Sequence, residues 1–62
     1  MINKNLLVIG NMVKFYEHGY SGRDIVGQIK AVDDLNYELR VTDLSGKEWV
    51  VGASSIVHCW IN

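Results

Sequence analysis

Residues 37–51 read YELRVTDLSGKEWVV, and this stretch decides the fold class. Tyr37, Leu39 and Val41 alternate with polar residues, which is typical of a strand with one buried face. Residues 44–47 follow with a glycine, which supplies the positive φ that a tight turn needs. A second apolar run at residues 48–51 returns from that turn. We therefore predict a β-hairpin with strands at residues 37–42 and 48–51.

The segments outside the hairpin are also short apolar runs separated by turn residues. We predict further strands at residues 12–16, with Val13 and Phe15 inward, at residues 25–32 and at residues 56–61. Gly27, inside the second of these, indicates a bulge or a close approach of another backbone. A polar loop at 17–24, a turn at 33–36 and a 3₁₀ turn within 52–55 connect the strands. No stretch of ten residues keeps helical spacing, so the prediction is an all-β domain.

Size and charge limit the function before any motif is considered. The chain has 62 residues and a formal net charge of −1, which excludes a two-domain enzyme or a large cleft within one chain. Its cations are dispersed, which disfavours a general nucleic-acid binder. The apolar run at 6–9 is too short for a membrane span or a secretory leader, and Cys59 stands alone. We therefore expect a cytoplasmic protein without membrane association, complete as a small phage or mobile-element gene product.

The order of five short strands with a long first loop resembles the SH3-like small barrel. The resemblance covers residues 9–57 and rests on IGNMVKF at 9–15, GQI at 27–29, YELRV at 37–41, and Trp49 followed by SSI at 54–56. KOW-type and Tudor-like domains, the small photosystem I barrel subunit and the type II dihydrofolate reductases share this architecture. The resemblance implies one domain over 1–62, with an extended lead-in at 1–8, the barrel at 9–58 and a tail at 59–62.

The first loop carries aromatic and charged residues together. Loops on a rigid barrel are common binding surfaces, and aromatic side chains stack on peptides, bases or cations. The alternative is that the tyrosines cover the barrel ends and that Trp49 belongs to the core. We take the loop with the facing strand as the candidate binding site, formed by Tyr16, His18, Tyr20, Arg23 and Trp49.

The two ends of the chain carry apolar residues on both faces of their segments. Strand alternation places His58 and Trp60 on one face and Cys59 on the other. Surplus apolar surface of this kind indicates self-association or a protein partner, although the two ends covering each other is the alternative. The candidate association surface comprises Leu6, Leu7, Val8, Trp60 and Ile61.

Other chemistries find weaker support in the sequence. A zinc site needs three or four protein ligands, and His58 and Cys59, as neighbours on a strand, face opposite ways. Ser54 and Ser55 near His58 lack an orienting acid. We therefore expect no metal, no cofactor and no catalytic residues.

The function predicted from the sequence is a small non-enzymatic module that binds protein, serving as a modulator of a host protein. The first alternative is a nucleic-acid or nucleotide binder, which requires Lys14, Arg23, Lys30, Arg40 and Lys47 to converge beside Tyr20 or Trp49. The second is a homo-oligomeric enzyme that resembles the type II reductases. That family carries Gln-Ile-Tyr on the strand lining its pore, where this chain has EWVV at 48–51, so the resemblance does not extend to the reductase residues.

Overall fold

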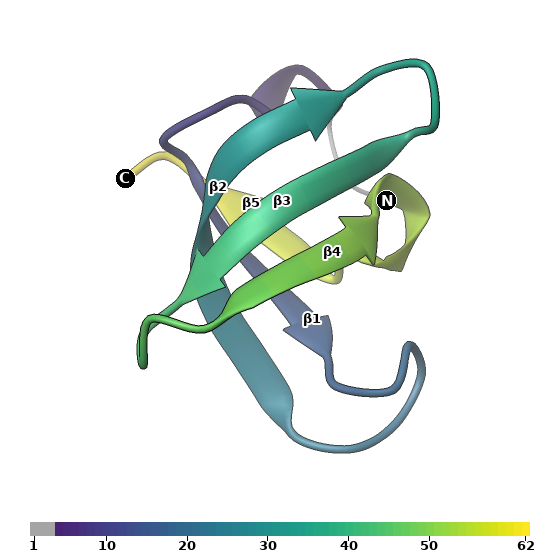
Figure 1. The fold of residues 1–62 in the computed structure, drawn as a ribbon, viewed down its shortest axis with the longest axis vertical. Helices are drawn as coiled ribbons and strands as arrows, with labels where there is room; N and C mark the ends of the chain where they lie inside the picture. Colours follow the sequence, from purple (N-terminus) through teal and green to yellow (C-terminus); the bar gives the residue numbers. More distant parts are fainter. Residues whose placement is uncertain (1–3) are drawn as a thin grey trace.

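The computed structural model describes residues 4–62 and consists almost entirely of strands. The elements are the 3₁₀ turn η1 (Lys4–Leu6), strands β1 (Met12–Tyr16), β2 (Asp24–Asp33), β3 (Glu38–Asp43) and β4 (Glu48–Gly52), the 3₁₀ turn η2 (Ala53–Ser55), and strand β5 (His58–Trp60). They form one antiparallel sheet of five strands in the order β4-β3-β2-β1-β5 (Figure 1). The all-β prediction is confirmed. No ladder within residues 4–62 joins β4 to β5, so the sheet is not closed by hydrogen bonds.

β2 is the longest strand and connects the two halves of the sheet. It pairs with β1 through Asp24–Gln28 and with β3 from Gly27 onward, and Figure 1 shows it curving along the length of the molecule. A Cβ on Gly27 would lie 2.6 Å from the Thr42 carbonyl oxygen. The expected close backbone approach at Gly27 is confirmed, and a register shift follows between Ile29 and Ala31.

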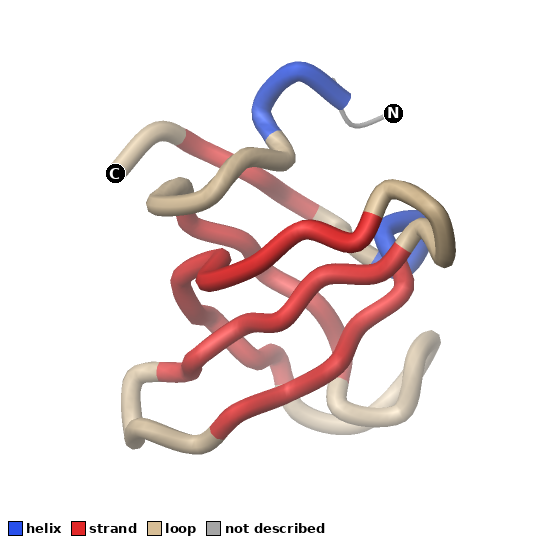
Figure 2. The backbone as a smooth tube through the Cα atoms, turned by 45° about the horizontal axis from the view of Figure 1, so that its top comes forward, coloured by secondary structure: helices blue, strands red, loops and turns tan. Residues whose placement is uncertain are grey.

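Figure 2 shows the curvature of the sheet, and the buried side chains form a single hydrophobic cluster. Val13 and Phe15 point inward as predicted, and Ile29 and Val41 are fully buried beside them. The buried side chains are Leu7, Val13, Phe15, Ile25, Ile29, Leu39, Val41, Val51, Ala53, Ile56 and Cys59.

Tyr37 departs from the predicted strand. It has a φ of 56° and stands at the end of the β2–β3 turn, where it is 44% exposed, whereas Leu39 and Val41 are buried as expected. The turn extends this far because the Asp33 carboxylate accepts hydrogen bonds from the main-chain and side-chain nitrogens of Asn36. β3 therefore starts at Glu38, and the prediction of an inward Tyr37 is wrong.

The N-terminal segment also differs from its expected form. Its described part is not extended, because residues 4–6 form η1 and the chain then turns. The Leu6 carbonyl accepts hydrogen bonds from Asn11 Nδ2 and Cys59 Sγ. The rest of the expected lead-in, residues 1–3, lies outside the described residues. At the other end, β5 starts at His58 and runs to Trp60, beyond the expected boundary at residue 58.

Candidate functional site

The first loop, residues 17–23, is an ordered continuation of the β1–β2 ladder. The Glu17 amide donates to the Arg23 carbonyl at 3.0 Å, and the His18 amide donates to the Ser21 carbonyl at 2.9 Å. The Arg23 guanidinium also donates to both oxygens of the Glu17 carboxylate, with the shorter contact at 2.9 Å. This pairing lowers the pKa of Glu17 and raises that of Arg23. The loop is therefore held in one shape by contacts at its base.

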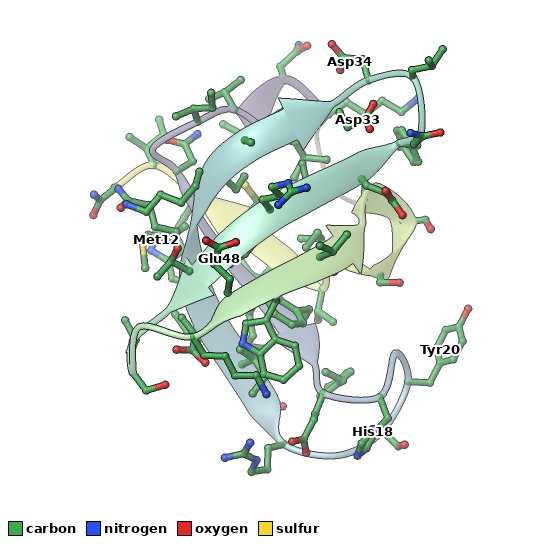
Figure 3. The ribbon with its side chains drawn as sticks, viewed as in Figure 1. Met12, His18, Tyr20, Asp33, Asp34 and Glu48 are labelled. Carbon is green, nitrogen blue, oxygen red and sulfur yellow. The ribbon has the colours of Figure 1, made fainter. Side chains whose placement is uncertain are left out.

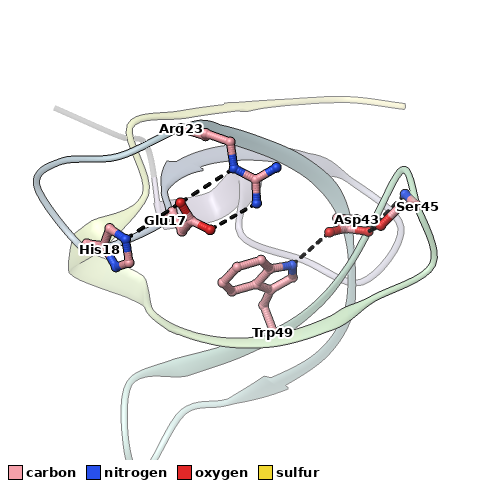
Figure 4. A network of polar contacts seen from close by, with 6 residues as sticks. All are labelled: Glu17, His18, Arg23, Asp43, Ser45 and Trp49. Carbon is pink, nitrogen blue, oxygen red and sulfur yellow. Dashed lines mark hydrogen bonds and ion pairs between the residues drawn. The ribbon is translucent and has the colours of Figure 1, made fainter.

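Trp49 of β4 faces this loop and is fixed from several sides (Figure 4). Its indole Nε1 donates to the Asp43 carboxylate at 2.9 Å, and its ring meets the Phe15 ring edge-on with centroids 5.6 Å apart. The ammonium of Lys47 lies 4.2 Å from the centre of the indole ring. These contacts hold the ring partly buried at the margin of the core, with a fixed orientation.

A groove of about 140 Å³ lies between the first loop and β4. Tyr16 and Gly19 line it from β1 and the loop, while Trp49 and Val50 line it from β4 and Ser55 from η2. No residue of β3 lines the groove. Since β3 is the ladder neighbour of β4 within residues 4–62, the groove lies along the open edge of β4.

The main chain of β4 offers hydrogen-bonding groups along this edge. The Asp43 amide donates to the Lys47 carbonyl, and the Ala53 amide donates to the Tyr37 carbonyl. Because antiparallel pairing alternates, the main-chain groups of Trp49 and Val51 point toward β3, and those of Glu48 and Val50 point away from it. The structure shows no partner for these outward groups among the described residues. The groove therefore has an aromatic wall and an unpaired strand edge.

The residues of the predicted binding site are brought together only in part. Tyr16 and Trp49 line the groove, but His18, Tyr20 and Arg23 do not. Tyr20 is 97% exposed and extends away from the body of the molecule at the loop tip, with His18 nearby on the loop (Figure 3). Arg23 is engaged with Glu17. Tyr16 and Trp49 are thus the two predicted residues that share one concave surface.

The candidate association surface loses a member in the folded chain. Leu7 belongs to the core, and Leu6 packs against it, so the expectation that Leu7 is available for a partner is wrong. The reason is the turn after η1, which folds this segment back over the core. Val8, Trp60 and Ile61 keep exposed fractions of 46%, 37% and 74%.

The cations needed for nucleic-acid binding are largely engaged with carboxylates. Lys14 pairs with Asp24 at 3.7 Å and Arg40 with Glu48 at 4.0 Å. A phosphate would have to compete with these carboxylates, although each exposed pair is weak. Lys47 is the cation that contacts Trp49. Of the five cations named for nucleic-acid binding, Lys14, Arg23 and Arg40 therefore contact carboxylates in the described chain.

Burial raises the pKa of the Cys59 thiol, which keeps it protonated at neutral pH. Cys59 is buried while His58 is exposed, so the two side chains face opposite ways as expected.

Residues 4–62 hold no group of three or more His, Cys, Asp or Glu side chains placed to bind a metal ion. In this same range no helix has the length and apolarity needed to cross a bilayer.

Sequence reasoning missed Asp43 and the main chain of Val50. An aspartate at the first position of a tight turn is a recognisable capping signal, so Asp43 was open to prediction. The free edge of β4 could not be predicted, because it depends on the strand order.

Comparisons with family models, curated proteins and solved structures found no match to this chain.

Proposed function

We propose that this chain is a non-enzymatic module that binds an extended segment of a partner protein along the open edge of β4. The observation that carries the proposal is the groove between Tyr16 and Trp49, one side of which is the unpaired edge of β4. Strand addition of this kind uses main-chain hydrogen bonds for affinity and pockets for alternate side chains for selectivity.

The proposed scaffold is the SH3-like small barrel. The order β4-β3-β2-β1-β5 and the sharing of β2 between β1 and β3 support it. An incoming strand would lie between β4 and the loop that follows β1, where the described sheet is open. The partner would thus extend the sheet without displacing any strand of this chain.

Each part of the groove has a role in this mode of binding. The N–H and C=O groups of Glu48 and Val50 would pair with the partner main chain. Successive side chains of a strand point to opposite faces, so every second side chain of the partner strand would enter between Tyr16 and Trp49. Aromatic walls favour an apolar or aromatic side chain at that position.

The charge distribution of the chain supports a protein as the partner. A net charge of −1 and the pairing of three of the six Lys and Arg residues with carboxylates support contacts with protein.

The proposal is tested with peptides selected from a random library for binding to the folded chain. Val50→Pro removes an outward N–H without removing a ladder bond, and proline is tolerated on edge strands. The matched control Val50→Thr keeps that N–H and the branched shape. We expect Val50→Pro to weaken peptide binding at least about tenfold, through a lost hydrogen bond and steric exclusion, and Val50→Thr to leave it within about twofold. Isothermal titration calorimetry gives both values.

A second set of ligands keeps the test valid if Val50→Pro does not fold. Selected peptides are N-methylated at single positions and measured against the unmodified chain. Strand addition predicts an alternating pattern, in which every second methyl group abolishes binding. Equal tolerance of N-methylation at all positions would exclude pairing with β4.

A further inference from the structure

A second concave site lies at the opposite end of the molecule from the first loop. It is a cavity of about 110 Å³ between η1, the β2–β3 turn and the start of β3. Figure 3 shows Asp33 and Asp34 at this end and His18 and Tyr20 at the other. Its volume is well below the roughly 300–1,000 Å³ of sites for drug-sized ligands. The cavity therefore has room for a single side chain rather than for a cofactor.

The lining of this cavity combines an apolar floor with an aromatic wall. Leu7 and Leu39 form part of the floor and are buried in the core. Tyr37 forms the wall, and its φ of 56° places it in the left-handed region, which is costly for a bulky residue. The fold thus presents a phenol ring at a turn position where glycine or asparagine would be less strained.

The charges around the cavity are unbalanced. Asp33, Asp34 and Glu38 stand among the residues that line the cavity, against the one cationic residue Lys4. Hydrogen bonds from Asn36 lower the pKa of Asp33, so that carboxylate stays ionised near neutral pH. The surroundings of the cavity therefore favour a cation.

One cation already lies on the aromatic wall. Lys4 Nζ lies 5.3 Å from the centre of the Tyr37 ring, which is within the range of cation–π attraction. Among the described residues, no carboxylate lies within ion-pair distance of this ammonium. Lys4 is thus held by the ring and by long-range attraction, which is a weak hold for an exposed side chain.

We propose that this cavity binds a lysine side chain of a partner protein, and that Lys4 occupies the site in its absence. The alkyl part of the incoming lysine would lie over Leu7 and Leu39, and its ammonium would replace that of Lys4 on the Tyr37 ring. The site is separate from the β4 groove and does not depend on strand addition there.

Competition by Lys4 gives the proposal a specific signature. Removing the internal cation frees the site, so Lys4→Ala should tighten binding of an added lysine. The expected gain is about two- to fivefold, which corresponds to one exposed cation–π contact. Removing the Tyr37 ring should weaken the binding of an added lysine. The variant Tyr37→Gly serves for this, because glycine adopts a positive φ without strain and the fold is preserved.

The test is a nuclear magnetic resonance titration of the isotopically labelled chain with Nα-acetyl-lysine N-methylamide. The neutral comparison probe carries a second acetyl group on its Nε. We expect saturable shifts of the Asp34 and Glu38 amides with the charged probe and none with the neutral one. Lys47→Ala is the matched control, because Lys47 also covers an aromatic ring, that of Trp49, but lies outside the cavity.

Three results would overturn the proposal. They are the absence of saturable shifts in both the unmodified chain and Lys4→Ala, equal shifts with the neutral probe, and unchanged binding in Tyr37→Gly. Since Lys4→Ala and Tyr37→Gly replace no residue that lines the β4 groove, a negative result with them leaves the groove proposal to its own test.

Discussion

At the scale of single residues, Asp43 is the polar centre of the hairpin. Its carboxylate accepts hydrogen bonds from the Ser45 amide, the Ser45 hydroxyl, the Lys47 amide and the Trp49 indole, all within 2.9 Å. These bonds lower the pKa of Asp43 far below its usual range, with the Trp49 indole contributing most. One side chain thus closes the turn and orients the aromatic wall of the groove.

This network makes the hairpin sensitive to acid. A carboxylate with a lowered folded-state pKa adds stability that is fully present above its unfolded pKa of about 4 and is lost as pH falls toward the folded value. We predict that the chain loses thermal stability progressively below about pH 4. The Asp43→Asn variant, followed by circular dichroism, should be less stable at neutral pH and show a shallower acid dependence. An identical pH profile in the variant would show that Asp43 has no such role.

Single residues also mark the limit of prediction from sequence. Alternation correctly placed Val13, Phe15, Leu39 and Val41 in the core, because a strand with one buried face has a fixed period of two. It failed at Tyr37, where the Asp33–Asn36 hydrogen bonds extend the turn. Local hydrogen bonding of side chain to main chain overrides periodicity at such positions.

At the scale of elements, the contact between β2 and β3 depends on the absence of a side chain at Gly27. A Cβ there would meet the Thr42 carbonyl oxygen and Val41 Cγ1, both at 2.6 Å. Neither neighbour moves easily, since one is backbone and the other lies in the fully buried Val41 side chain. The close approach occurs where β2 pairs with both β1 and β3.

We predict that Gly27→Ala destabilises the fold by about 1–3 kcal/mol, the usual cost of forcing atoms into a packed core. Gly52→Ala is the control, because a Cβ there meets nothing closer than 3.8 Å and the φ of −62° suits alanine. Urea unfolding measures both. Equal stability of the two variants would contradict the structural role assigned to Gly27.

Element types and order were predictable, whereas the pairing that creates the candidate site was not. Turn residues and short apolar runs indicated five strands, η2 and the tight turn after β3 from local signals. The open edge of β4 depends on which strands are neighbours. That arrangement is set by packing over the whole chain, so the sequence pointed to Trp49 and Tyr16 without indicating that Val50 presents a free main chain beside them.

At the scale of the whole molecule, the single chain exposes about as much surface as a folded monomer of its mass. Its accessible surface is 4256 Å², close to the roughly 4,000 Å² expected for a folded monomer of this mass. With Leu7 buried in the core, less apolar surface remains at the chain ends than the sequence indicated. Because Cys59 is the one cysteine of the chain, no disulfide within the chain supports the core, and its stability comes from the packing of short strands.

The remaining exposed apolar residues bear on self-association. We predict concentration-dependent association through Val8, Trp60 and Ile61, and the double variant Trp60→Ser with Ile61→Ser should weaken it. Light scattering over a range of concentrations measures the mass of each protein. A constant mass of 7.0 kDa for the unmodified chain would rule out association through these residues.

The proposed addition of a partner strand to β4 can be tested by amide hydrogen exchange at Glu48 and Val50. These amides have no hydrogen-bond partner in the described chain, so they should exchange fast when the protein is free. With a selected peptide bound, we predict that both amides become strongly protected while the amides of β5 keep their exchange rates. Bound peptide that leaves the Glu48 and Val50 amides exchanging as fast as before would contradict it.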